Sequence, residues 1–400
     1  MKKSLLALAV LGAFAGAAQA QSSVTIYGIV DTGVVYSSKV ATGVSNGAVT
    51  NGSKFALNSG VLQGSRIGFK GVEDLGGGLS AVFNLESGFN NDDGTQSVGG
   101  NLFNRKSVVG LAGGFGTVLL GRQTDFLDDI GAIASVADFG GWTQNVGTGL
   151  SRIQGTRTNN SIRYNTSNLN GFTASLIYGF GEQAGKTSAG QSFGAGLKYE
   201  NGPLALAAGY YQSKIGSTAA DAGTQVNVAA NTQPGDTALK TFTLAAQYQL
   251  SNARVYGSWA RTKQQLTANG PVDANGNAIA ATGTATTITP NKYWVIGGQN
   301  NDKTDTFELG GSYNLSPALK LIGAVDHSRV NYVNAGAPKG KLTQVSLGAD
   351  YSLSKRTDVY GLLGYLRAKD TVNPGIAGSS NSTVSDNSQT AVAVGIRHKF

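Results

Sequence analysis

Apolar and polar residues alternate along most of the chain with a period of two. The even-numbered positions carry the apolar residues in three clear stretches: 172–181 (FTASLIYGFG), 241–250 (TFTLAAQYQL) and 391–400 (AVAVGIRHKF). Successive side chains of a β-strand point to opposite faces of its sheet. The pattern therefore predicts strands of about ten residues with one apolar and one polar face.

The connections between these stretches are alternately short and long. Seven tight turns are predicted at 73–78, 112–116, 168–171, 200–203, 250–253, 315–318 and 353–356. Eight longer connections, rich in Gly, Ser, Thr and Asn, are predicted at roughly 37–54, 91–102, 123–159, 182–190, 213–239, 264–303, 330–340 and 369–389. Fifteen connections join sixteen strands, and strict alternation places all short turns at one end.

An even number of strands with short turns at one end and long loops at the other is typical of bacterial outer-membrane barrels. A soluble β-sandwich also gives alternating strands, but sixteen strands would then show a domain boundary, and no linker interrupts this chain. The predicted fold is all-β, a sixteen-stranded antiparallel transmembrane β-barrel. Its lumen is too wide for side chains to fill and holds water.

The first twenty residues have the features of an export signal. Lys2 and Lys3 precede an apolar stretch from Leu5 to Ala18, and Ala18-Gln19-Ala20 forms an A-x-A cleavage site. We therefore expect a signal peptide at 1–20, a mature barrel at 21–400 and a location in the bacterial outer membrane.

Composition and charge exclude several other classes of protein. The 400 residues include no Cys and only two His, and no G-x-S-x-G motif is present, so no catalytic, cofactor or metal site is predicted. His327 and His398 are assigned structural places at the membrane interface. Although the net charge is +8, Lys and Arg occur without a basic run, which argues against nucleic acid as a partner.

Several segments, in order along the mature chain, resemble those of the trimeric porins of Gram-negative bacteria, particularly β-proteobacteria. The similar segments are Ser23–Asp31 (SVTIYGIVD), Ser65–Gly71 (SRIGFKG), Asn104–Leu111 (NRKSVVGL), Asp138–Gly141 (DFGG), Asn160–Tyr164 (NSIRY) and the terminal Phe400. The resemblance implies a homotrimer in which the third loop, here 123–159, folds inward and narrows each pore. It also implies that Phe400 is a terminal assembly signal.

Parity and this resemblance together predict the residues of the pore constriction. A basic side chain on the lipid face costs about 2–4 kcal/mol near the midplane, so Arg66, Lys70 and Arg163 are expected to face the lumen. Adjacent Arg105 and Lys106 are not expected both to face inward, and the resemblance favours Arg105. Asp138 is carried over as the pore carboxylate.

Three residues are assigned less specifically, to the pore or to a subunit contact: Lys70, Arg122 and Asp125. In similar porins the place of Arg122 lies near the subunit contact. Asp125 begins the third loop, where a carboxylate stabilises the positive N-terminal end of a short helical turn.

The predicted function is passive diffusion of small hydrophilic solutes and ions, with moderate anion selectivity from Arg66, Arg105 and Arg163. The alternatives are a substrate-specific channel, a surface adhesin or receptor acting through its long loops, and, more remotely, an outer-membrane hydrolase. Expected partners are two further copies of the chain, outer-membrane lipid and lipopolysaccharide, and the transported solutes.

Overall fold

The computed structural model describes most of the strand residues and part of the connections. The described residues are 23–45, 48–97, 100–134, 136–143, 157–182, 184–185, 187, 191–214, 238–264, 295–296, 299–332, 339–371, 373–376 and 386–400. The predicted signal peptide at 1–20 and most of the predicted connections at 213–239 and 264–303 lie outside these residues.

Eighteen strand segments form one antiparallel sheet. The first nine are β1 (Ser23–Ser45), β2 (Ala48–Ser59), β3 (Arg66–Gly76), β4 (Leu79–Gly88), β5 (Lys106–Gly113), β6 (Gly116–Thr124), β7 (Arg157–Asn165), β8 (Phe172–Gly179) and β9 (Ser192–Asn201). The others are β10 (Leu204–Lys214), β11 (Ala238–Gln249), β12 (Ala253–Gln264), β13 (Val295–Ile296), β14 (Gln299–Asn314), β15 (Leu319–Tyr332), β16 (Gly340–Ser352), β17 (Thr357–Lys369) and β18 (Ser388–Lys399).

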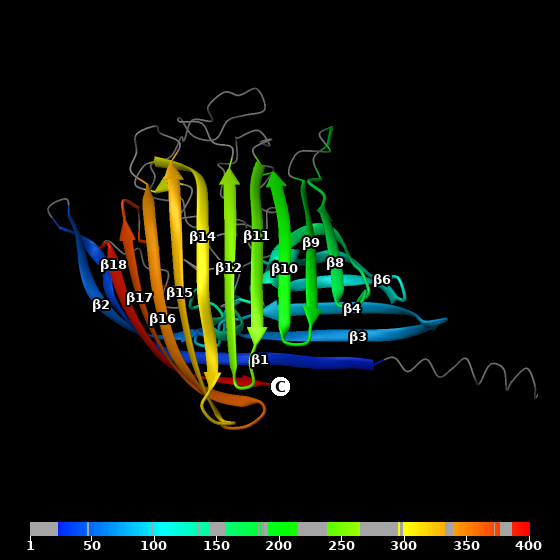
Figure 1. Ribbon diagram of the computed structural model, residues 1–400, viewed down its shortest axis with the longest axis horizontal. Coiled ribbons are helices and arrows are strands. Elements are labelled where there is room, and N and C mark those ends of the chain that lie inside the picture. Colours follow the sequence, from blue (N-terminus) through cyan, green and yellow to red (C-terminus); the bar gives the residue numbers. More distant parts are fainter. Residues whose placement is uncertain are drawn as a thin grey trace, which may run out of the picture.

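The segments build a closed barrel of sixteen wall strands (Figure 1). β2 and β3 both pair with β1 and are two parts of one wall strand, and the two-residue β13 only pairs with the end of β14. The barrel closes where β1 pairs with β18, from Ile29 opposite Lys399 to Ser37 opposite Ala391. The predicted fold class is therefore confirmed.

The terminal residue completes this closure. Phe400 exchanges two backbone hydrogen bonds with Gly28, each 3.1 Å long. A Cβ atom at Gly28 would lie 2.3 Å from the Phe400 ring. The Phe400 ring therefore packs against β1 only because residue 28 is a glycine.

All seven predicted tight turns join neighbouring strands, but the first predicted long connection is wrong. β1 continues to Ser45 and β2 begins at Ala48, so strands occupy nearly all of the predicted loop at 37–54. Both faces of these strand ends carry many polar residues, so the alternation that marks a strand in lipid is missing from their sequence.

The chain bends inward instead between β2 and β3, at residues 60–65. Val61 and Leu62 are buried there, and the carboxylate of Asp31 accepts hydrogen bonds from the backbone N–H groups of Leu62 (3.4 Å) and Gln63 (2.9 Å). The Tyr360 hydroxyl donates a third bond to Asp31, 2.7 Å long. This buried carboxylate thus joins the bend to β17.

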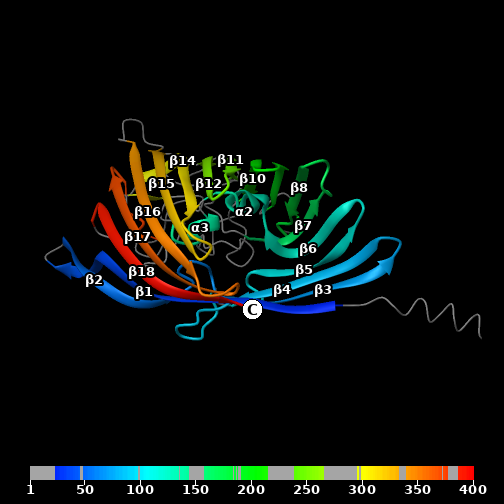
Figure 2. The ribbon, with the colours of Figure 1, turned by 60° about the horizontal axis from the view of Figure 1, so that its bottom comes forward.

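The described part of the third loop, 123–143 without residue 135, lies inside the ring of strands and contains α2 (Phe126–Gly131) and α3 (Val136–Phe139) (Figure 2). No helix in the described part of the chain is long and apolar enough to cross a membrane. One face of α2 packs on inward-facing residues of β8, β10 and β11. At Gly196 a Cβ atom would lie 1.6 Å from the Phe126 ring, so this glycine on β9 makes room for the helix.

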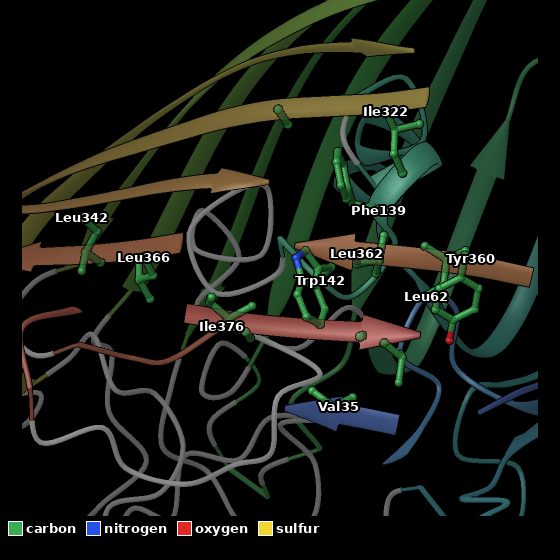
Figure 3. Packing of buried hydrophobic residues seen from close by; sticks show 14 of the residues in the cluster. Val35, Leu62, Phe139, Trp142, Ile322, Leu342, Tyr360, Leu362, Leu366 and Ile376 are labelled. Carbon is green, nitrogen blue, oxygen red and sulfur yellow. The ribbon is translucent and has the colours of Figure 1, made fainter. Parts of the chain in front are cut away.

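The segment at the end of α3 packs in a second apolar cluster, against β15–β18 and β1 (Figure 3). Phe139 and Trp142 are fully buried there, beside Leu62 of the inward bend and Ile376 of the last connection. Gly364 of β17 faces the Trp142 indole, whose Nε1 would lie 2.9 Å from an added Cβ. The two clusters hold the loop across the lumen.

We expect Gly140→Ala to detach the tip of the third loop from the inward bend. Gly140 has φ +52°, and an added Cβ would lie 1.5 Å from the Leu62 carbonyl oxygen. A left-handed backbone conformation costs about 1–3 kcal/mol at any residue other than glycine, even without the close contact. The free energy of unfolding in urea should fall by at least this amount, and the fluorescence of Trp142 should shift to the red.

Gly114→Ala is the matched control, because Gly114 lies in the tight turn between β5 and β6 with no atom within 4 Å of an added Cβ. Equal effects of the two substitutions would contradict the proposed close contact at Gly140.

Candidate functional site

Arg66 and Arg105 lie together on the inner wall and share one carboxylate. Arg105 Nε donates to Glu86 Oε1 at 2.6 Å, and Arg66 approaches the same oxygen within 3.9 Å. The Tyr27 hydroxyl lies 2.9 Å from Glu86 Oε2 and 3.0 Å from Asn84 Oδ1, and these two oxygens share its one proton. Two guanidinium groups around one carboxylate leave one net positive charge at this place.

Sequence reasoning missed Glu86, although parity identifies it. Phe83 and Leu85 take the lipid face of β4, so Asn84 and Glu86 face the lumen. Glu86 is the one carboxylate of β4. Its place on the lumen face, next to the strand that carries Arg66 and Lys70, was available from the pattern alone.

Lys106 also faces the lumen, so the prediction that Arg105 and Lys106 do not both face inward is wrong. In β5 the outer positions are Val109 and Leu111, both exposed, which places Lys106 on the inner face directly opposite Glu86. Arg105 precedes the first residue of β5. Strand alternation therefore does not govern its direction, and both side chains reach the lumen.

Arg157 completes the basic group, and the acid that faces it comes from α2. Arg157 Nε donates to the backbone oxygen of Arg105 at 2.8 Å. The carboxylate of Asp128 interacts electrostatically with Arg66, Lys106 and Arg157. We name Arg66, Arg105, Lys106 and Arg157, with Glu86, the basic cluster.

Arg163 is placed beside this cluster but is bound to the third loop. Its guanidinium pairs with Asp129 of α2 and donates to Thr124 O at 2.9 Å. Its Nε donates to Asn165 Oδ1 and Ser175 Oγ, both at 3.0 Å. With four partners and 8% exposure, Arg163 joins the start of the loop to the wall.

Asp138 pairs with basic residues of the opposite wall rather than with any of the three predicted arginines. Its carboxylate accepts from Arg254 at 2.8 Å and from Lys320 at 3.3 Å. Arg254 also donates to the Ala134 carbonyl oxygen at 3.1 Å. These contacts fasten the middle of the third loop to β12 and β15.

A further ion-pair network continues along this wall. Lys320 approaches Asp350 at 3.7 Å, and Arg397 bridges Asp350 at 3.5 Å and Asp358 at 3.0 Å. Arg397 also donates to Gln63 of the inward bend at 3.3 Å. Acidic and basic groups alternate here, so the wall of β15–β18 carries little net charge.

The less specific assignments are placed as follows. Lys70 lies over the Tyr27 ring at 5.5 Å, on the lumen side of β3. Arg122 donates to Asn104 O at 2.9 Å and bonds to Asn159 Oδ1. Asp125 caps α2, accepting from the Leu127 N–H at 2.7 Å; a side-chain oxygen at this place satisfies a helix N–H that has no partner within the helix.

Known proteins resemble this chain over its whole length. The family model described as Gram-negative porin matches residues 7–371. The chain belongs to the Gram-negative porin family. It is 34% identical to outer membrane porin protein 32 of Delftia acidovorans and 32% identical to an outer membrane porin protein of Bordetella pertussis, with 100% of both chains covered in each comparison. It is thus an outer-membrane porin, and the members of this family are channels.

Solved porin structures share the fold. An anion-selective porin from Comamonas acidovorans superposes with a TM-score of 0.72 at 30% identity, covering 95% of this chain and 100% of that one. The trimer form of OmpT from Vibrio cholerae has a TM-score of 0.64 at 16% identity, covering 95% and 99%, and supports the fold alone. The suspected resemblance to the porins is confirmed.

We expect Arg163→Gln to loosen the third loop of this porin more than it changes ion selectivity. The substitution removes the ion pair with Asp129 and the bond to the Thr124 carbonyl. A hydrogen bond to a charged group contributes about 1.5–3 kcal/mol, and the half-exposed Asp129 places the loss at the lower end. Single-channel recordings should show larger conductance fluctuations, with a nearly unchanged reversal potential.

Arg163→Lys is the informative companion, because an ammonium keeps the charge but cannot reach four partners at once. Equal recordings from this variant and the parent would show that charge alone holds the loop.

Proposed function

We propose that this porin conducts small hydrophilic solutes passively through a water-filled pore and prefers anions moderately. The observation that carries the proposal is the basic cluster, which faces α2 across the constriction. Arg66, Arg105, Lys106 and Arg157 outnumber the nearby acids Glu86 and Asp128. Surplus positive charge in a narrow aqueous gap concentrates anions within about a Debye length, ~10 Å at 0.1 M salt.

The pairing with Glu86 supports a moderate rather than a strong preference. One carboxylate cancels one of two adjacent guanidinium charges and holds both groups in a fixed place. The charges are also separated in space: the carboxylate of Asp128 lies on α2, and the basic side chains lie on the wall at β3, β5 and β7. Such separation creates a transverse field, which orients dipolar solutes as they pass.

The role of Asp138 follows its contacts. Because Arg254 and Lys320 already neutralise this carboxylate, we propose that Asp138 positions the third loop and that Glu86 and Asp128 are the acids sensed by permeating ions. Arg163, bound to Asp129, contributes to position in the same way. The proposed filter is therefore Arg66, Arg105, Lys106 and Arg157.

The double variant Arg66→Gln/Arg105→Gln should shift the reversal potential in a salt gradient toward cation selectivity. A change of one kT in pore potential alters the concentration of each ion about threefold, and the ratio of anion to cation permeability should fall by at least this factor. Glu86→Gln should shift it the other way. Both shifts should shrink as salt rises.

The control Lys355→Gln/Arg356→Gln removes the same charge from the exposed turn between β16 and β17. Its reversal potential at 0.1 M salt should match the parent. A parental value for Arg66→Gln/Arg105→Gln would exclude these arginines as the filter, and a sealed barrel without conductance would favour a receptor over a pore.

We also propose that the mature chain begins at Gln21 and forms a homotrimer through the outer face of β1 and β2. This face presents exposed apolar side chains, among them Ile26 at 60% and Phe55 at 74%. The OmpT structure described as a trimer form offers a precedent for such assembly within this fold.

Unheated protein should migrate in gels as an oligomer that heat dissociates. Ile26→Asn should lower the temperature of dissociation, because an amide then lies in an apolar contact between subunits. Leu309→Asn, on the exposed outer face of β14, is the matched control and should leave that temperature unchanged. The reverse ranking would place the subunit contact on the other side of the barrel.

A further inference from the structure

A row of polar side chains crosses the inner wall of the barrel on β12, β14, β15 and β16. Register places each member directly opposite the next, and we name the four residues the polar row: Ser258, Glu308, Asp326 and Gln344. Directly opposed residues have Cβ atoms about 4.5–5.5 Å apart. The neighbouring Val325 is exposed on the lipid face, so Asp326 and the rest of the row lie on the lumen face.

Asp326, in the middle of the polar row, is completely buried and lacks a hydrogen-bond donor. Neither of its carboxylate oxygens accepts a hydrogen bond from a residue that the structure describes. The carboxyl group of Glu308 is also buried and interacts with Asp326 directly. A buried carboxylate without compensation is very costly, and such groups in proteins are paired or coordinate a metal ion.

Two further oxygens near Asp326 have no hydrogen-bond partner in the described part of the chain. Gln344 is fully buried, and its Nε2 donates to the Trp142 carbonyl oxygen at 3.0 Å, but its Oε1 accepts no hydrogen bond. The Tyr256 hydroxyl is also buried without a partner, and it interacts electrostatically with both carboxyl groups of the polar row. Oxygens of two carboxyl groups, one amide and one phenol therefore gather at this place.

A shared proton would satisfy only part of this arrangement. One proton between Glu308 and Asp326 makes one O–H···O contact, leaves one negative charge buried and leaves the Gln344 Oε1 atom without a donor. A divalent cation balances both carboxylate charges. Calcium takes about six to eight oxygen ligands in flexible geometry, whereas magnesium demands a near-ideal octahedron and retains several waters. An irregular, fully buried set of oxygens therefore suits calcium better.

We propose that the polar row binds one calcium ion through oxygens of Asp326, Glu308 and Gln344, with the Tyr256 hydroxyl beside them. An all-oxygen site needs neither Cys nor His, the residues whose scarcity argued against a metal site in the sequence. The ion neutralises the buried acidic pair. It also holds the amide of Gln344, which in turn binds the Trp142 carbonyl oxygen of the third loop.

The test measures binding of radioactive calcium to the full-length porin in detergent micelles, after lipopolysaccharide and bound ions have been removed. The parent should bind one ion per chain at or below about 1 mM calcium, the range of extracellular calcium modules. Asp326→Asn should weaken this binding at least about tenfold, because the charge of the ligands sets calcium affinity. Glu308→Gln should have a similar effect.

Asp74→Asn and Glu73→Gln are the matched controls, because they make the same changes at exposed positions near the tight turn between β3 and β4. Both should bind calcium as the parent does. Glu308→Gln keeps the test decisive if Asp326→Asn folds poorly, and heat-modified migration in gels shows which variants are folded.

No binding by the parent up to about 1 mM calcium, or equal binding by the parent and the folded row variants, would overturn the proposal. So would an infrared band of a protonated carboxyl group that persists at this calcium concentration in the parent and is lost in Asp326→Asn. A shared proton would then occupy the place assigned to the ion.

Discussion

Closure of the backbone hydrogen-bond ladder is the constraint on which this structure depends. In hydrocarbon an unpaired N–H or C=O costs several kcal/mol, so the last strand has to meet the first. β18 meets β1 in an antiparallel register, and Phe400 extends the contact by two bonds to Gly28. A wall of sixteen strands encloses more space than side chains can fill, so the width of the pore depends on a loop.

The third loop lies in a water-filled lumen, so it stays in place only if apolar clusters hold it against the wall. α2 supplies one by packing Phe126 and Ile130 on the wall, and Trp142 supplies the other between β17 and the last connection. Glycines at Gly196 and Gly364 open the wall at these two places. Ion pairs of Arg163 with Asp129 and of Arg254 with Asp138 fix the loop between the cores.

The wall could be predicted from sequence further than the loop could. Period-two alternation located the strands in lipid, because one face had to be apolar, and turn chemistry located all seven tight turns. The alternation did not reveal the strands at 37–54, because they extend beyond the lipid and both of their faces are rich in polar residues. The inward bend at 60–65 gave no signal, because its buried residues Val61 and Leu62 read as strand.

Within the site, strand alternation predicted which side chains face the lumen, but not which residues they contact. It placed Arg66 and Arg163 on the lumen side, yet the structure gives Arg163 four partners and places Arg66 3.9 Å from a carboxylate that it shares with Arg105. Which cation a carboxylate meets depends on the path of the third loop, and that path depends on long-range contacts such as Trp142 with Gly364. No local pattern carries that information.

The same residue types have different consequences on the two faces of one wall. Inside, an arginine next to water can be paired with a carboxylate, as Arg105 is with Glu86, at the cost of part of its field in the pore. On the outer face, Arg261 of β12 pairs with Asp305 of β14 at 2.6 Å, away from the lumen. The same type of ion pair therefore alters the field of the pore only where it lies on the inner face.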